Sequence, residues 1–167
     1  LPQVAVEHHL DREHFLAATC RIPTASSTDW RALLIDSPDE MRALLRRSHR
    51  IAVLGIKPET RADQPAHFAP VYTVEAGFEV IPVPVYYPEV TEILGKPVYR
   101  RLVDVPGDVD IVNVFRRPEH CAGVARDAVA VKAKGVWLQS GIVNNEAREI
   151  GVEWALKQSE ELLAHGA

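Results

Sequence analysis

The sequence has few cysteines and no apolar run long enough to cross a membrane. Its two cysteines, Cys20 and Cys121, lie far apart and belong to no C-x-x-C pair, so zinc has no support. Two unpaired, reduced thiols are the simpler interpretation, and a disulfide is the alternative. A membrane-spanning helix needs about 20 apolar residues. No run approaches that length and the start lacks a signal pattern, so we expect a cytoplasmic location and no membrane partner.

An excess of basic residues is also missing. The 19 Lys and Arg residues and 23 Asp and Glu residues give a formal net charge of −4. Such a balance offers no electrostatic footprint for nucleic acid. A chain of 167 residues, 47% apolar and 25% charged, has the size and composition of one globular domain with a proper core.

A glycine-rich dinucleotide fingerprint is absent from the place where it would be expected. The segment IAVLGIKPETRADQPAHFAPVY, residues 51–72, begins as an apolar strand and becomes polar before a helix-like stretch. A strand leads into a helix in this way through a phosphate-binding loop. The G-x-G-x-x-G pattern of dinucleotide folds is not there, however, and only Gly55 is present.

From residue 51 onward the hydrophobic pattern alternates between strands and helices. Apolar runs predict strands over 51–56, 78–85, 108–115 and 136–139. Helices are predicted over about 65–76 and 119–133, and from residue 144. This alternation predicts an α/β fold, namely a Rossmann-like, doubly wound, mostly parallel sheet with helices on both faces.

Prolines and polar residues modify this pattern locally. The two prolines of the second strand suit a position near an edge or at the strand's end, and Pro70 should disturb the first turns of its helix. Residues 86–102 predict a loop, one helical turn and a short extended piece.

The residues before the first strand predict helices. Residues 10–20 form a helix pattern with Asp11 as its N-cap, and 21–30 read as a loop. A second helix begins after Ser37, a suitable N-cap, with Pro38 at the first helical position.

Ligands of doubly wound sheets bind beyond the carboxyl ends of the strands. This rule selects the loops after residues 56, 85 and 115. In the first loop, Gly55 would let a phosphate approach the backbone, the following helix would supply free N–H groups, and Lys57 and Arg61 would add charge. The alternative is a solvated loop with two surface cations.

The loop after the third strand carries an aromatic residue and a cation. Phe115 could line an adenine pocket while Arg116 meets a phosphate. The alternative is a core phenylalanine at the strand end followed by exposed arginines. The loop after the second strand weakens a third interpretation, NAD binding, because no acid precedes Glu89 to hold the ribose hydroxyls.

No catalytic or metal-binding set is apparent. Ser140 lies outside a G-x-S-x-G elbow, and the seven histidines show no ligand spacing. His120 and Cys121 are adjacent and would point apart on a helix, which disfavours a base–thiol pair. Asp108 and Asp110 fit a turn at the beginning of a strand.

Three segments carry a resemblance to a known family: IAVLGIKPETRADQPAHF, GFEVIPVPVYYPEVTEILGKPVYRRLVDVPGDVDIVNVFRRPE and AKGVWLQSGIVNNEA. Together they resemble the CoA-binding protein family, small cytosolic Rossmann-like proteins similar to the CoA-binding domain of the succinyl-CoA synthetase alpha subunit. The resemblance covers about residues 37–150. Its most specific pieces are EILGKPVYRRLVDVPGDVDIVNVFRRPE and VWLQSGI.

The resemblance implies a site for coenzyme A or a short acyl-CoA at the strand ends selected above. By position it implies a phosphate loop, a border of the nucleotide and a closing segment, formed respectively by Gly55, Ile56, Lys57 and Arg61, by Pro82, Val83 and Pro84, and by Phe115, Arg116 and Pro118. We therefore divide the chain into an N-terminal helical extension, 1–36, and a CoA-binding Rossmann-like domain, 37–167.

Two segments depart from the family. Its members commonly have Asn-Pro after the second strand, where this chain has Pro84-Val85-Tyr86-Tyr87, and they continue after NNEA into a last strand, where this chain predicts a helix. The predicted function is non-catalytic CoA binding with a sensing or regulatory role. The alternatives are an NAD(P)-binding redox-sensing module and an enzyme that uses acyl-CoA with a partner subunit. A homodimer is plausible because small domains of this type often pair through helices.

Overall fold

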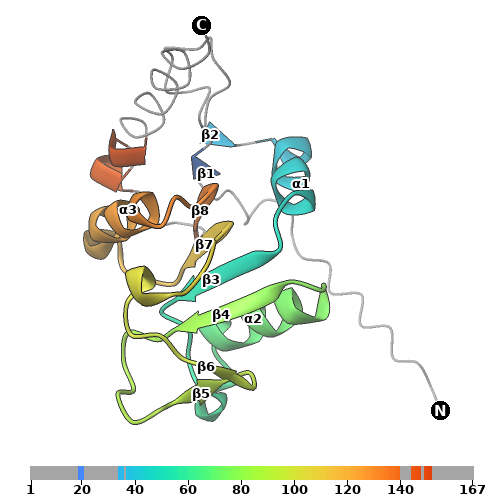
Figure 1. Cartoon of the computed structure of the whole chain (residues 1–167), viewed down its shortest axis with the longest axis vertical. Helices are drawn as coiled ribbons and strands as arrows, with labels where there is room; N and C mark the ends of the chain where they lie inside the picture. Colours follow the sequence, from blue (N-terminus) through green and yellow to red (C-terminus); the bar gives the residue numbers. More distant parts are fainter. Residues whose placement is uncertain (1–18, 21–33, 36, 140–143, 148, 152–167) are drawn as a thin grey trace, which may run out of the picture.

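The computed structural model describes residues 19–20, 34–35, 37–139, 144–147 and 149–151. Its centre is a parallel sheet of order β4-β3-β7-β8 (Figure 1). The strands are β3 (Arg50–Leu54), β4 (Glu79–Val83), β7 (Ile111–Val114) and β8 (Gly135–Leu138). The chain runs from β3 to β4 on one side and returns to β7 and β8 on the other. The switch point therefore lies between β3 and β7.

Helices connect and cover these strands. They are α1 (Pro38–Arg46), α2 (Pro65–Glu75) and α3 (Cys121–Ala130), with short 3₁₀ turns η3 (Glu59–Arg61), η4 (Leu102–Asp104) and η5 (Pro118–His120). Residues 145–147 and 149–151 are also helical. The predicted doubly wound α/β fold is confirmed, and β4 lies at the edge of the sheet, as its prolines indicated. None of the described helices could cross a membrane.

Both faces of the sheet are buried. Ala52 and Leu54 of β3 point into a cluster that includes Val124 of α3 and Leu102 of η4. The alternate residues of β3 point the other way and pack with a second cluster whose other members include Leu44 of α1. Burial on both faces explains why the strands appear in the sequence as continuous apolar runs.

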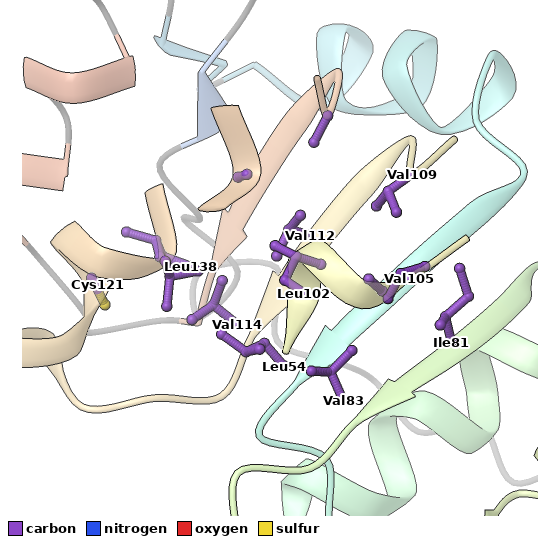
Figure 2. Close-up of a cluster of buried hydrophobic side chains, with 14 residues drawn as sticks. Leu54, Ile81, Val83, Leu102, Val105, Val109, Val112, Val114, Cys121 and Leu138 are labelled. Atoms are coloured by element: carbon purple, nitrogen blue, oxygen red, sulfur yellow. The ribbon is translucent and has the colours of Figure 1, made fainter. Parts of the chain in front are cut away.

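The four strands end at one level. Leu54 pairs in register with Val83 on one side and Val114 on the other, and Val114 pairs with Leu138. All four side chains are buried, and Figure 2 shows them as a row across the sheet. The loops that leave the carboxyl ends of the strands therefore start from one edge of the sheet, at the same level.

The start of α1 follows the sequence prediction. The Ser37 hydroxyl accepts a hydrogen bond from the amide of Glu40 at 3.2 Å, and Pro38 occupies the first helical turn. Such a cap satisfies one of the donors that a helix leaves free at its N-terminus.

Two short antiparallel pairs depart from the predictions. Thr19–Cys20 form β1, which pairs with Leu34–Ile35, β2, so the helix predicted over 10–20 is wrong at its last two residues. Residues 10–18 lie outside the described part of the chain. Pairing with β2 satisfies backbone groups that a helix would have satisfied internally, and tertiary context overrides local propensity in this way. The side chain of Ile35 joins the second core cluster.

The second pair is a hairpin where a helical turn was predicted. It consists of β5 (Glu92–Ile93) and β6 (Lys96–Pro97). Leu94 and Gly95 connect them with positive φ values of 52° and 68°. Two successive positive φ values produce the tight turn that antiparallel hairpins favour, and burial of Ile93 holds the hairpin on the core. The predicted helical turn in 86–102 is therefore wrong.

Asp110 joins three strands at the amino edge of the sheet. Its Oδ2 accepts hydrogen bonds from the amides of His49 and Arg50 at 2.7 and 2.9 Å, beside the start of β3. Its Oδ1 lies 2.6 Å from the Nζ of Lys134, which precedes β8. Burial opposes ionisation, but these donors prevail and lower the pKa of Asp110 from 3.8 to about 2. The prediction that Asp110 belongs to a turn at a strand's beginning is confirmed.

Replacing this carboxylate should destabilise the fold in a pH-dependent way. A depressed pKa contributes stability above the unfolded value, and that stability is lost as the pH falls through the folded value. For Asp110→Asn we expect a loss of about 2 kcal/mol of unfolding free energy at neutral pH, because the lowered pKa corresponds to that linkage energy. Between about pH 4 and pH 2 the wild type should lose this advantage.

Urea unfolding of both proteins at several pH values measures the effect. Asp108→Asn is the matched control, because Asp108 is an exposed carboxylate two positions away. Equal losses in the two variants would show that Asp110 has no special role.

Candidate functional site

The loops after β3 and β7 meet at Gly55. Its φ is +86°, a region that side chains other than glycine rarely adopt. A Cβ at this position would lie 2.3 Å from the carbonyl oxygen of Phe115. The Gly55 amide donates to the Val83 carbonyl at 2.9 Å, and the Phe115 amide donates to the Leu54 carbonyl at 2.8 Å. Backbone contacts thus bring the ends of β3, β4 and β7 together at the switch point.

Pro70 helps to hold the first loop against α2. A proline inside a helix has no amide hydrogen, so it cannot bond the carbonyl four residues earlier. That carbonyl, of Ala66, accepts instead from the amide of Lys57 at 3.1 Å. Nδ1 of the buried His67 donates to the Lys57 carbonyl at 2.8 Å, since a carbonyl can only accept. The helix continues through Pro70, and the bond that it lacks fixes the loop.

The start of α2 has fewer free backbone N–H groups for binding an anion than the sequence predicted. Pro65 has no amide hydrogen, and the amides of His67 and Phe68 both donate to the Gln64 carbonyl, at 2.8 and 3.1 Å. The Phe68 bond is the regular first hydrogen bond of the helix, so the expectation of free N–H groups is wrong for the His67 amide. The side-chain oxygen of Gln64 accepts a hydrogen bond from the Nζ of Lys57. Gln64 is thus a residue of the site that the sequence reasoning missed.

Cationic side chains supply the charge at this edge. Lys57 is half-buried, Arg61 is exposed on η3, and Arg116 is half-buried after β7. None of the three forms an ion pair with a carboxylate in the described part of the chain. The carboxylate of their neighbour Glu59 accepts a hydrogen bond from the Leu94 amide at 2.7 Å, which ties η3 to the hairpin.

Four of the residues expected at the site are buried. The side chains of Ile56 and Val83 lie in the core, at 1% and 0% exposure, so only their backbones could face a ligand. Pro82 and Pro84 are buried as well. The Pro82 carbonyl accepts from the Tyr99 amide at 2.9 Å, which holds the residues after the hairpin against β4.

The residues expected to close the site differ in their surroundings. Phe115 is half-buried and packs against the second core cluster, as its alternative interpretation held, while its carbonyl faces Gly55. Pro118 is exposed, and its carbonyl accepts from the side-chain amide of Asn144 at 2.7 Å. Asn144 also caps the helix after β8 by accepting from the Ala147 amide at 2.7 Å. Pro118 therefore links the loop after β7 to that helix.

Tyr86 is the other residue that the sequence reasoning did not place at the site. The guanidinium carbon of Arg116 lies 5.8 Å from the centre of the Tyr86 ring. Arg100 holds the segment that follows, donating to the carbonyls of Tyr87 and Pro88 at 3.1 and 2.9 Å. The signal was available, because Tyr86 directly follows the second predicted strand, in a loop already selected.

The surroundings of Cys121, near this edge, do not favour a reactive thiolate. Cys121 is a free thiol, so the unpaired interpretation is confirmed for it. Burial raises its pKa, which disfavours the thiolate, and the adjacent His120 is exposed. No cluster of three or more potential metal ligands occurs among the residues described.

Comparisons with known proteins agree with the fold. The family described as the CoA binding domain matches residues 49–159. The uncharacterized protein YneT of Bacillus subtilis is 40% identical over 114 residues, which cover 68% of this chain and 81% of that protein. A solved structure from Thermus thermophilus is 35% identical with a TM-score of 0.60, covering 74% of this chain and 87% of its own. A hypothetical protein from Pyrococcus horikoshii OT3 is 28% identical with a TM-score of 0.63, covering 76% and 92%.

Substituting Gly55 should cost stability through both backbone strain and contact. For Gly55→Ala we expect a loss of about 2–4 kcal/mol of unfolding free energy, because the added Cβ would displace the Phe115 carbonyl. Gly77→Ala is the matched control: Gly77 also has a positive φ, +93°, but a Cβ there would meet nothing within 4 Å. Chemical denaturation measures both variants. A loss no larger at Gly55 than at Gly77 would mean that the loops can move apart freely.

Proposed function

Because the chain belongs to the CoA binding domain family, we propose that it binds coenzyme A or a short acyl-CoA where β3, β4 and β7 end. Family membership supports CoA binding in general. The observation that carries the proposed location is the meeting of the loops at Gly55, together with three cations on these loops that have no carboxylate partner among the described residues. A small residue at the switch point and nearby positive charge are what a phosphorylated nucleotide requires.

The charges of ligand and site are complementary. Coenzyme A carries a diphosphate and a 3′-phosphate, so it presents several negative charges at its nucleotide end. Arg61 and Arg116 can each hold a phosphate through two parallel hydrogen bonds, and Lys57 acts as a point charge. Lys57 is already oriented by Gln64. Arg61 is exposed and would be ordered by the ligand.

We propose binding without turnover, in a sensing or regulatory role. Cations, aromatic rings and prolines make up most of the residues that we propose for the site, and such side chains bind and orient a ligand. His67, the histidine closest to the first loop in sequence, is buried and donates to the Lys57 carbonyl. Cys121 has a raised pKa because it is buried.

The NAD(P) alternative is weaker for a structural reason. Ribose hydroxyls in dinucleotide sites are held by an acid at the end of the second strand. In this chain Pro84, Val85 and Tyr86 follow β4, and the first acid after the strand, Glu89, is exposed. NADH is therefore a suitable comparison ligand.

The homodimer expected from the sequence stays a prediction.

Removal of the site cations should weaken CoA binding. We expect Arg61→Ala and Arg116→Ala each to raise the Kd for CoA about 10- to 100-fold, the range for loss of a charge-assisted hydrogen bond. Arg46→Ala is the control, because Arg46 is exposed in the last turn of α1, before the amino end of β3. Isothermal titration with CoA, acetyl-CoA and NADH measures the constants.

The same titrations of the wild-type protein distinguish CoA binding from NAD(P) binding. Saturable binding of CoA or acetyl-CoA, weakened in the two site variants and unchanged in Arg46→Ala, is the expected result. Tighter binding of NADH would favour the redox-sensing alternative. No response to any ligand at millimolar concentration would mean that the fold is present without this ligand.

A further inference from the structure

A contact between Arg116 and Tyr86 bridges the end of β3. Tyr86 follows β4 and Arg116 follows β7, and these strands flank β3 on either side. The guanidinium carbon of Arg116 lies 5.8 Å from the centre of the Tyr86 ring, within the range of a cation–π contact. The two side chains therefore meet across the switch point, at the carboxyl edge where the loops converge on Gly55.

The Tyr86 ring is exposed although it lies on a constrained segment. Its exposure is 65%, and the preceding Val85 is also exposed, at 39%. Arg100 binds the carbonyls of Tyr87, Pro88 and Val90, so the segment after Tyr86 is held in place. Arg116 covers one face of the ring. A ring that remains 65% exposed offers its opposite face to a planar group.

We infer that Tyr86 is the stacking platform for the adenine ring of the bound nucleotide, with Arg116 placed beside the phosphate that adenosine carries. This inference rests on the proposed function. Aromatic side chains stack on nucleobases, and a neighbouring arginine adds a cation for the phosphate. The pantetheine arm of coenzyme A has no ring, so adenine is the part of the ligand that can use this surface.

The location also fits the geometry of the edge. Phosphates held by Lys57 and Arg61 would lie over the loop after β3, and β4 is the next strand of the sheet. Tyr86, in the loop after β4, is thus a neighbour of the phosphate loop rather than a distant surface residue. Its contact with Arg116 places a ring and a cation within reach of one nucleotide.

Variants of Tyr86 test the inference, with CoA and dephospho-CoA as the two probes. Tyr86→Ala should raise the Kd for both ligands by the same factor, roughly 5- to 100-fold, because both contain adenine. Tyr86→Phe keeps the ring and should stay within about threefold of the wild type, since the hydroxyl has no part in stacking. Arg116→Ala should weaken CoA more than dephospho-CoA, which lacks the 3′-phosphate.

Tyr72→Ala is the matched control. Tyr72 is 58% exposed, close to the value for Tyr86, but lies on α2. Tyr72→Ala should leave the Kd values for CoA and dephospho-CoA unchanged. Thermal melts of all variants check that they are folded. Equal losses at Tyr72 and Tyr86, or none at Tyr86, would overturn the inference.

Two further outcomes are informative. If Tyr86→Ala weakens only CoA and not dephospho-CoA, Tyr86 acts by positioning Arg116 for the phosphate, and the stacking role is wrong. A wild type that binds neither ligand would overturn the proposed function itself. The two failures are therefore distinguishable.

Discussion

The architecture of the carboxyl edge depends on one close approach, between Gly55 and the carbonyl of Phe115. A Cβ at Gly55 would lie 2.3 Å from that oxygen. The loops after β3 and β7 can therefore be this close only because residue 55 has no side chain. The approach lets the Gly55 amide bond to β4 and the Phe115 amide bond to β3. Lys57, Arg61 and Arg116 stand on loops whose starting points are set by these bonds. A larger residue would displace every group that we propose to hold phosphate.

The two edges of the sheet treat charge in opposite ways. At the amino edge the Asp110 carboxylate is buried and satisfied by two amides and by Lys134, which lowers its pKa and stabilises the fold. At the carboxyl edge the cations Lys57, Arg61 and Arg116 have no carboxylate among the described residues. Burying a charge costs free energy unless the charge is paired, whereas a charge at a solvated edge can remain unpaired until a ligand binds. The amino edge thus contributes to stability, and the carboxyl edge is where we propose that the ligand binds.

The sequence predicted the layers of the fold because each strand is buried on both faces and therefore appears as an apolar run. It predicted the start of α1 because the Ser37 cap is a local interaction. It failed for the hairpin, whose two-residue strands are too short for any periodicity and depend on burial of Ile93. The helix prediction for Thr19–Cys20 was wrong for a related reason, because these residues pair with Leu34–Ile35, which are distant in the sequence.

The site was predictable only in part, for physical reasons that the residues show. The rule about strand ends selected loops that do leave one edge of the sheet, because the four strands end at one level. It could not tell that Ile56 and Val83 point into the core, since a continuous apolar run does not reveal which face a residue occupies. The contact of Arg116 with Tyr86 joins loops that only the sheet order brings together.

A single glycine, in place of a glycine-rich turn, changes what kind of ligand such an edge can hold. Backbone amides are fixed in place, so using them costs little ordering, but here Pro65 has no amide hydrogen and the Gln64 carbonyl occupies the His67 amide. In the proposed site side-chain cations take the place of such amides, and holding Lys or Arg in one rotamer costs up to about 2 kcal/mol each. A ligand with one phosphate would repay little of that cost. On the proposed function, coenzyme A would offset it at several points, because it carries several phosphates and an adenine ring that can stack on Tyr86.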